Sequence, residues 1–160
     1  MPTRRKFIIA MSSLIGGAGL AKPVLAASHS KNHDVAMLNA ASNDDNIPNV
    51  FEPAILHVKK GDTVTFLASD TGHNSASKRG MIPEGAEPWN GAIDEEITVT
   101  FDVPGIYGYL CLPHYEMGMV GLIVVDNNLS NLKAVRKVRH PGDARKAFRA
   151  LLKEVEQSAK

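Results

Sequence analysis

Hydrophobic and polar residues alternate in several short stretches of the chain. Residues 35–40, "VAMLNA", form the first, and residues 54–69, "AILHVKKGDTVTFLAS", contain two such runs around a Lys-Lys-Gly-Asp turn. Residues 95–111, "EEITVTFDVPGIYGYLC", repeat this plan around a Val-Pro-Gly turn. Alternation with a period of two predicts half-buried strands, and the continuous apolar run at 119–126 predicts a fully buried strand. Short strands separated by turns are typical of an antiparallel β-sandwich or barrel, which we expect over residues 35–128.

Two segments between these strands lack periodicity. Residues 42–49, "SNDDNIPN", are rich in turn-forming residues and predict a loop. Residues 70–91, "DTGHNSASKRGMIPEGAEPWNG", contain many Gly and Pro residues. An irregular segment of this length in a compact domain is usually functional or contains a short helix.

The periodicity changes to that of helices in residues 129–160. We expect one helix within residues 130–141, ended by Pro141, and a second within residues 142–160, begun near Asp143. The second helix has a single apolar stripe, formed by Ala144, Ala147, Phe148, Leu151, Leu152 and Val155. Such a stripe predicts packing on the sheet, and a helix that binds a membrane surface or a partner is the alternative.

The N-terminus has the pattern of an export signal. Paired arginines in "TRRKF" precede an apolar stretch at 8–20 and small residues suited to signal-peptidase cleavage. We interpret residues 1–26 as a twin-arginine signal, which predicts bacterial export to the periplasm, with cleavage after Ala26 or Ala27. A membrane anchor is the alternative, but the apolar stretch is short for a span. Residues 27–34 are expected to form a flexible polar lead.

The net charge and the single cysteine narrow the classes of partner and the roles that we expect. The chain has 18 basic and 17 acidic residues, and removal of residues 1–26 takes away four basic residues and no acidic ones. The remaining net charge of −3 gives no reason to expect nucleic acid or a membrane as a partner. The single cysteine, Cys111, excludes an intramolecular disulfide. Because an exposed lone thiol is a liability in an oxidising compartment, we expect Cys111 to have another role.

The segment "CLPHYEMGM" brings potential metal ligands together in sequence. It contains Cys111, His114, Met117 and Met119. Taken singly, such residues are more often structural. Taken together, a thiolate, an imidazole and a thioether suit copper, and two imidazoles, one thiolate and a weak axial methionine form a blue-copper site. The second imidazole must come from elsewhere, and His73 in "TGHNS" follows a predicted strand.

Other chemistries agree less well with this segment. Covalent c-type haem requires a second cysteine, and structural zinc sites usually have more thiolates. A Cys–His nucleophile could be drawn from Cys111 with His73 or His114, but protease partners are normally remote in sequence, and His114 follows after only three residues.

Several segments together resemble the pseudoazurin family of cupredoxins, the type 1 blue-copper proteins. They are "FEPAILHVKKGDTVTF", "GHN", "MIPEGAE", "PGIYGYLCLPHYEMGMVGLIVV" and the helical tail, and the likeness extends from residue 35 to the C-terminus. The resemblance implies a mainly β, Greek-key sandwich or barrel with two C-terminal helices. It also implies a periplasmic monomer that binds one mononuclear type 1 copper ion and transfers single electrons without acting as an enzyme.

The resemblance also implies the ligand set, which is His73, Cys111, His114 and Met119. Met117 is the alternative axial ligand, because cupredoxins with a shorter ligand loop use a methionine three residues after the histidine. Asn74 resembles the asparagine that joins the two ligand loops near the sulfur, and Pro113 removes one competing backbone donor there. His114, Pro113 and Met117 would form the apolar patch through which electrons pass.

The expected partners are redox proteins, such as a copper nitrite reductase in denitrification and a cytochrome donor. Members of this family typically have lysines around the apolar patch that steer acidic partners. Several of the matching positions here hold no lysine, namely Ala40, Thr71, Asn90 and Leu110. Glu116 adds an acidic residue, while Lys78 and Arg79 remain. We therefore expect weak steering and a shallow dependence of association on salt.

Two further possibilities follow from the same residues. A copper-binding or copper-delivery protein would use the same ligands and is the alternative to an electron shuttle. Cleavage after Ala26 would also place His29 third in the mature chain, where a free amine, backbone nitrogens and an imidazole can bind Cu(II). A disordered polar tail is the simpler interpretation of that segment.

Overall fold

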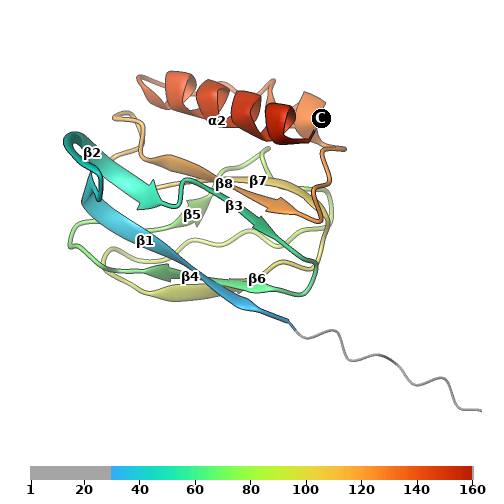
Figure 1. The fold of residues 1–160 in the computed structure, drawn as a ribbon, viewed down its shortest axis with the longest axis horizontal. Coiled ribbons are helices and arrows are strands. Elements are labelled where there is room, and N and C mark those ends of the chain that lie inside the picture. The colour runs from blue at the N-terminus through green and yellow to red at the C-terminus, as the bar shows by residue number, and fades with distance from the viewer. Residues whose placement is uncertain (1–29, 160) are drawn as a thin grey trace, which may run out of the picture.

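The computed structural model describes residues 30–159 of the 160-residue chain. The predicted export signal and His29 lie outside the described residues. Figure 1 shows a β-sandwich covered on one side by a helix. The elements are β1 (Asn32–Ala41), β2 (Asp44–Glu52), β3 (Ile55–Val58), β4 (Thr63–Leu67), β5 (Ala76–Ser77), β6 (Ile97–Thr100), β7 (Gly105–Leu110), β8 (Val120–Val125), α1 (Leu132–Val135) and α2 (Ala144–Ser158).

The strands form two four-stranded sheets, in the orders β2-β1-β4-β6 and β3-β8-β7-β5. This confirms the predicted mainly β sandwich. The expectation of a purely antiparallel arrangement is wrong, because β1 pairs with β4, and β3 with β8, in parallel. Several strands that follow each other in the chain, such as β3 and β4, therefore lie in different sheets. Strands that are far apart in the chain, such as β3 and β8, lie side by side.

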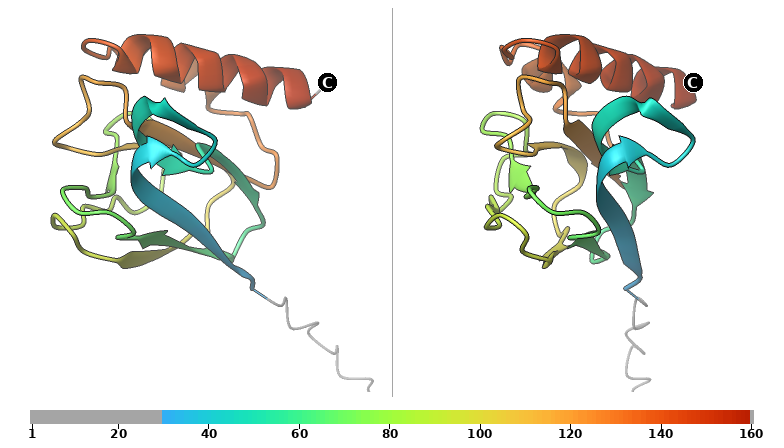
Figure 2. Two further views of the ribbon diagram at one scale, coloured as in Figure 1. Left: turned by 60° about the vertical axis from the view of Figure 1, so that its left-hand side comes forward. Right: turned by 90° about the vertical axis from the view of Figure 1, so that its left-hand side faces the viewer.

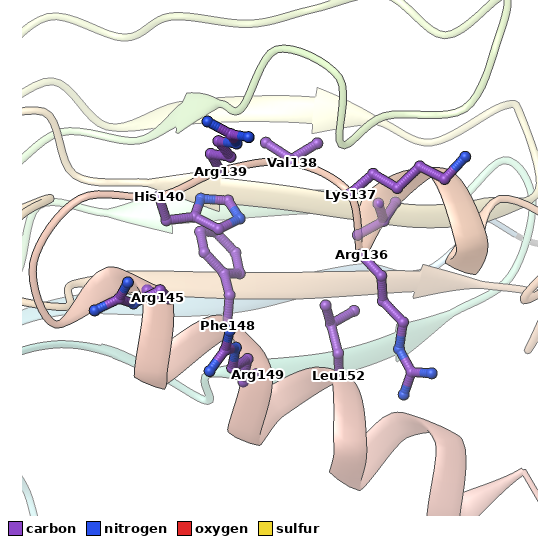
Figure 3. A pocket seen from close by; sticks show the side chains of 10 residues that line it. Arg136, Lys137, Val138, Arg139, His140, Arg145, Phe148, Arg149 and Leu152 are labelled. Atoms are coloured by element: carbon purple, nitrogen blue, oxygen red, sulfur yellow. The ribbon is translucent and has the colours of Figure 1, made fainter.

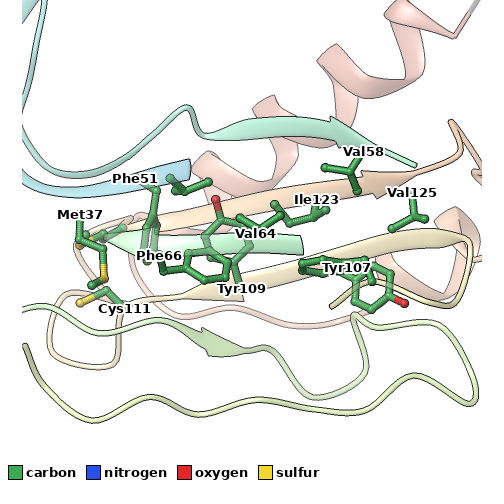
Figure 4. Packing of buried hydrophobic residues seen from close by; sticks show 13 residues of the cluster. Met37, Phe51, Val58, Val64, Phe66, Tyr107, Tyr109, Cys111, Ile123 and Val125 are labelled. Atoms are coloured by element: carbon green, nitrogen blue, oxygen red, sulfur yellow. The ribbon is translucent and has the colours of Figure 1, made fainter. Parts of the chain in front are cut away.

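The main core fills the space between the two sheets (Figure 4). Phe51 of β2, Phe66 of β4 and Tyr109 of β7 are fully buried, and the Tyr109 ring lies 4.7 Å from Phe51 and 5.0 Å from Phe66, centre to centre. Each such ring contributes on the order of 2–3 kcal/mol by its removal from water. The packed rings fix the spacing between the sheets, and this restricts the movement of the loops at the strand ends.

A second core lies under the C-terminal helix. In Figures 1 and 2, α2 lies over the outer face of the sheet that contains β7 and β8, on the side away from β4 and β6. The predicted apolar stripe faces this sheet: Ala144, Phe148, Leu152 and Val155 are buried, and Ala147 and Leu151 are partly buried. The stripe therefore packs inside the molecule.

The first predicted helix is much shorter than residues 130–141. Only Leu132–Val135 form a helix, α1. The side chain of Asn131 does not cap it, because its amide group bonds the backbone N–H and carbonyl of Ile106 in β7 at 2.9 and 2.8 Å. After α1 the chain turns so that Val138 packs beside Gly80, where an added side-chain carbon would lie 3.3 Å from it.

The predicted loop at 42–49 is wrong over most of its length, because β2 begins at Asp44 and pairs antiparallel with β1. The first half of β2 is exposed on both faces, so its sequence shows no alternation that could reveal a strand. β1 also begins at Asn32, and residues 32–34 pair with β4. The predicted flexible lead over 27–34 is therefore wrong for residues 32–34, and residues 27–29 lie outside the described part of the chain.

The long segment 70–91 contains the two-residue strand β5 and no helix. Ser77 of β5 holds its far end in place, because its backbone N–H donates to the Trp89 carbonyl at 2.9 Å and its hydroxyl bonds both the N–H and the carbonyl of Trp89. The segment therefore has a defined path without regular structure. Among residues 30–159, no helix is long and apolar enough to cross a membrane.

Candidate metal site

Two loops at one end of the sandwich carry the candidate ligands. His73 lies on the loop that follows β4, and Cys111 and His114 lie on the loop between β7 and β8. Figure 4 shows Cys111 at the same end of the core as Met37 of β1. Because β1 runs parallel to β4, its last residues reach this end as well. Three strands of the two sheets thus place their C-terminal ends around one site.

Three potential ligand atoms converge here. The Cys111 sulfur lies 3.7 Å from His73 Nδ1 and 3.6 Å from His114 Nδ1, and the two nitrogens are 3.1 Å apart. The point equidistant from all three atoms is about 2.0 Å from each, close to the roughly 2.0–2.3 Å that nitrogen and sulfur donors keep from a divalent first-row metal ion such as zinc. The chain therefore arranges a plane of two imidazoles and one thiol that fits a single ion.

The orientation of the His73 ring is fixed by Asn39 at the end of β1. His73 is fully buried, and its Nε2 lies 3.0 Å from Asn39 Oδ1. An amide oxygen can only accept, so Nε2 carries the proton and the Nδ1 lone pair points to the ligand plane. Burial, and then the nearby His114, lower the pKa of His73. The ring is thus held neutral in the tautomer that a metal ion requires.

The Cys111 sulfur is buried and lies near two backbone N–H donors. Burial raises the pKa of the thiol, while the backbone N–H groups of Asn74 and His114 act in the opposite direction. Without a cation, the thiol would remain protonated at neutral pH. A metal ion between the imidazoles would reverse this balance, because a coordinating thiol is deprotonated outright.

The side chain of Asn74 joins the two ligand loops. Its Oδ1 accepts a hydrogen bond from the Leu112 N–H at 2.7 Å, and its Nδ2 donates to the Gly91 carbonyl at 2.9 Å. Asn74 is buried, its bond to Gly91 is shielded from water, and its bond from Leu112 is partly shielded. The loop carrying His73 is thereby locked to the loop carrying Cys111.

The two methionines of the ligand loop lie in different surroundings. Met119 is buried, and its backbone bonds the His114 carbonyl at 3.2 Å and the Cys111 N–H at 3.1 Å. The side chain of Met117 is exposed, as is that of Leu112, at 56% and 55% of their surfaces. His114 is half-buried and Pro113 is exposed, so the partly exposed ligand has exposed apolar residues as close neighbours in the chain.

Three contacts around the ligand loop were missed by sequence analysis. Besides Asn39, the Tyr115 hydroxyl bonds His140 Nδ1 at 2.7 Å, and the backbone N–H of Asp143 donates to the Glu116 carbonyl at 2.8 Å. The C-terminal extension thus supports the ligand loop from behind. Nothing in the local pattern marks these residues, because each contact joins segments more than 20 residues apart.

One of the four positions matched to the family's lysines, Leu110, is not at the surface. Leu110 is buried at the end of β7, whereas Thr71 and Asn90 are exposed and Ala40 is partly exposed. The depleted positions at the surface are therefore Ala40, Thr71 and Asn90. Leu110 does not belong among them.

Comparison with known proteins agrees with this geometry. A model of the family described as "Copper binding proteins, plastocyanin/azurin family" matches residues 35–126. A putative pseudoazurin of Rhizobium leguminosarum bv. viciae is 36% identical over 97% of this chain and 95% of its own length. A pseudoazurin of Methylorubrum extorquens is 45% identical over 57% of this chain and 62% of its own length. A solved pseudoazurin structure from a Sinorhizobium species has a TM-score of 0.75 and 48% identity, covering 79% of this chain and 97% of that one.

The donor set fits the metal named by the family description. Softer ligands such as thiolate and thioether, with imidazole, favour copper over hard cations such as magnesium or calcium. His73, Cys111, His114 and Met119 are positioned to bind one copper ion.

Proposed function

Because the chain belongs to the pseudoazurins within the plastocyanin/azurin family of copper-binding proteins, we propose that His73, Cys111 and His114 would hold its copper ion, with Met119 as the weaker fourth ligand. The family and the ligand geometry make this a blue-copper electron-transfer protein. The observation that carries the ligand assignment is the convergence of three donor atoms at distances of 3.1, 3.6 and 3.7 Å.

The residues of the chain keep this site rigid during electron transfer. When bound, copper supplies a centre that gains and loses one electron. Asn39 fixes the His73 ring, Asn74 locks the two loops together, and the backbone N–H groups of Asn74 and His114 stabilise negative charge on the sulfur. Because these partners are fixed by the sandwich, little rearrangement accompanies the change in charge. No substrate bond is made or broken, so the protein is not an enzyme.

Electrons enter and leave through His114. Its ring connects the buried site to the surface, where Leu112, Pro113 and Met117 form an apolar patch. Such a patch suits brief docking of redox proteins, since it needs little charge matching. We propose that a monomer works in the periplasm between a cytochrome-type donor and an acceptor such as a copper nitrite reductase. The reduced number of lysines near the patch still predicts a shallow salt dependence of association.

Replacing each methionine tests the axial ligand. Met119→Leu should shift the visible absorption spectrum and the reduction potential of the copper-loaded protein, while Met117→Leu should leave both nearly unchanged because Met117 is exposed. Equal shifts in the two variants, or a larger one in Met117→Leu, would overturn the assignment. Both substitutions conserve side-chain volume closely, so folding should be preserved.

Repeated redox cycling distinguishes an electron shuttle from a copper-delivery protein. A shuttle should keep its copper through many cycles in the presence of a competing chelator, and its spectrum should return fully each time. Loss of copper to the chelator in the reduced state would favour delivery.

A further inference from the structure

A cationic groove lies between α2 and the segment 136–140, apart from the ligand plane (Figure 3). Its volume is about 690 Å³. Arg139 of the segment and Arg145 and Arg149 of α2 are exposed around it. The volume is in the range of roughly 300–1,000 Å³ that is usual for small-molecule sites.

The positive charges of this groove have few acidic partners. Among residues 30–159, Arg136 pairs with Glu156 at 2.7 Å, but no ion pair involves Arg139, Arg145 or Arg149. Arg145 and Arg149 are four residues apart on one helix, where like charges repel, and no acidic residue stands three or four positions from either. The sequence therefore concentrates unpaired guanidinium groups around a concave surface at some cost in stability.

The floor of the groove is apolar. Phe148 and Leu152 of α2 and Val135 of α1 are buried beneath it, and the partly exposed Val138 and His140 give it its accessible apolar surface. The His140 ring lies 4.4 Å from the Phe148 ring, centre to centre, and Figure 3 shows the two rings together between Arg139 and Arg149. An aromatic or aliphatic group could contact this floor while an acidic group reaches the arginines.

We propose that this groove binds an organic anion with an apolar ring or chain and one phosphate, sulfonate or carboxylate group. The arginines select the charge, and the floor of Val138 and His140 selects the apolar part. An inorganic anion would leave the floor wet, and a neutral ring would leave the guanidinium groups without a partner. Neither alone should bind well.

The back of the groove adjoins the ligand loop. The Tyr115 hydroxyl and His140 Nδ1 share a hydrogen bond of 2.7 Å, and Tyr115 directly follows His114 in the chain. Lys78 lies over the Tyr115 ring, 5.5 Å from its centre, and adds positive charge on this side. Binding in the groove thus occurs behind the electron port, yet it needs no metal ion.

Titration calorimetry with 1-naphthyl phosphate tests the site, using the mature chain in metal-free and copper-loaded form at low salt. We expect saturable binding with the same stoichiometry of one in both forms. Inorganic phosphate and 1-naphthol should each bind at least about tenfold more weakly, since each lacks one half of the recognised chemistry.

Variants on α2 locate the binding. Arg149→Gln should weaken 1-naphthyl phosphate binding about fivefold to tenfold, as expected for loss of one charged hydrogen bond. Lys153→Gln removes the same charge from the same helix at an exposed position outside the groove, and it should leave binding unchanged. Absence of saturable binding, as expected if the groove receives only an acidic protein, would overturn the proposal. Equal losses in the two variants, or binding of phosphate as tight as that of its naphthyl ester, would overturn it too.

Discussion

The two ends of the sandwich are held together by opposite means. At one end, Asp62 is buried and its carboxylate accepts hydrogen bonds from the backbone N–H groups of Lys31 and Lys59, each at 2.9 Å, and from His33. At the other end, the Nδ1 atoms of His73 and His114 face each other at 3.1 Å beside the Cys111 sulfur.

The difference lies in which groups are satisfied by the protein itself. The donors around Asp62 complete its hydrogen bonding, so this end needs nothing from outside, and the same bonds hold the pKa of the carboxyl at about 2. At the ligand end, two imidazole nitrogens and a sulfur face one another, and this arrangement lowers stability unless a cation binds between them. One end therefore depends on pH for its stability, and the other depends on a metal ion.

Removing the Cys111 thiolate should have the largest effect, because it removes the metal dependence that distinguishes the ligand end from the Asp62 end. Copper should raise the melting temperature of the wild-type chain by more than about 10 °C, because an ion bound only by the folded state stabilises it by mass action. Cys111→Ser should lose the intense visible absorption and most of this rise, as measured by spectroscopy and calorimetry. Asp62→Asn, at the other end, should keep both. A full copper-induced rise in Cys111→Ser would contradict the proposed ligand set.

Cutting the link between the ligand loops should have the next largest effect. Asn74→Ala leaves the partly buried Leu112 N–H and the buried Gly91 carbonyl without partners, and it should lower the unfolding free energy of the metal-free protein by about 3 kcal/mol. The loss should be smaller in the copper-loaded protein, where the ion also joins the loops. Urea denaturation of both forms measures this.

A matched substitution in the hairpin between β1 and β2 serves as the control for Asn74. Asn43→Ala changes an exposed turn residue and should alter stability by no more than about 0.5 kcal/mol in either form. If Asn74→Ala were equally harmless, the loops would be held by other contacts.

The carboxylate end should respond to pH instead. The pKa of Asp62 is lowered from 3.8 to about 2 by the backbone N–H groups of Lys31 and Lys59 and then by His33. A lowered pKa stabilises the fold above pH 4, and this contribution is lost as the pH falls from about 4 to about 2. Asp62→Asn should therefore cost about 2 kcal/mol at pH 7, and its difference from wild type should shrink below pH 4.

Denaturation curves between pH 7 and pH 2 would reveal this loss. Asp45→Asn, an exposed carboxylate in β2, is the control and should follow wild type throughout. A difference between wild type and Asp62→Asn that stays constant to pH 2 would mean that the packing of Asp62, and not its charge, stabilises this end.

The smallest effect is expected at Asn39. Asn39→Ala removes the acceptor that fixes the His73 tautomer, and copper affinity should fall about tenfold, as is usual when the partner of a ligating histidine is lost. Asn32→Ala is the matched control: it lies on the same strand, and its side chain accepts from Thr63 and Thr65 at the far end. Competition with a copper chelator measures both affinities, and equal values would show that Asn39 is dispensable.

Strong local signals made much of the fold predictable from sequence. The alternation in β3, β4, β6 and β7 and the apolar run of β8 are local signals, and β7 and β8 are buried along their whole length. β2 had no such signal, because only its last residues reach the core, at Phe51. The helix within 130–141 was overestimated because its local pattern did not reveal that the chain leaves the helix after Val135 and packs Val138 beside Gly80.

The candidate site was predictable in part for a chemical reason. A lone cysteine next to a histidine and two methionines narrows the possible metals regardless of the fold. His73 was a candidate because it follows a predicted strand, and the resemblance to the cupredoxins implied the same residue. The choice between Met117 and Met119 is not visible in the spacing alone. Their burial distinguishes them, since Met117 is exposed and Met119 is not.

The sequence by itself determined which donor atoms the chain offers and which strands are buried, because residue type and periodicity are local properties. Only the tertiary structure decided that Asn39 orients His73, that His140 supports Tyr115 and that the arginines of α2 face those after α1. These contacts join segments that are distant along the chain. They follow from how two twisted sheets and one helix pack, which no local pattern encodes.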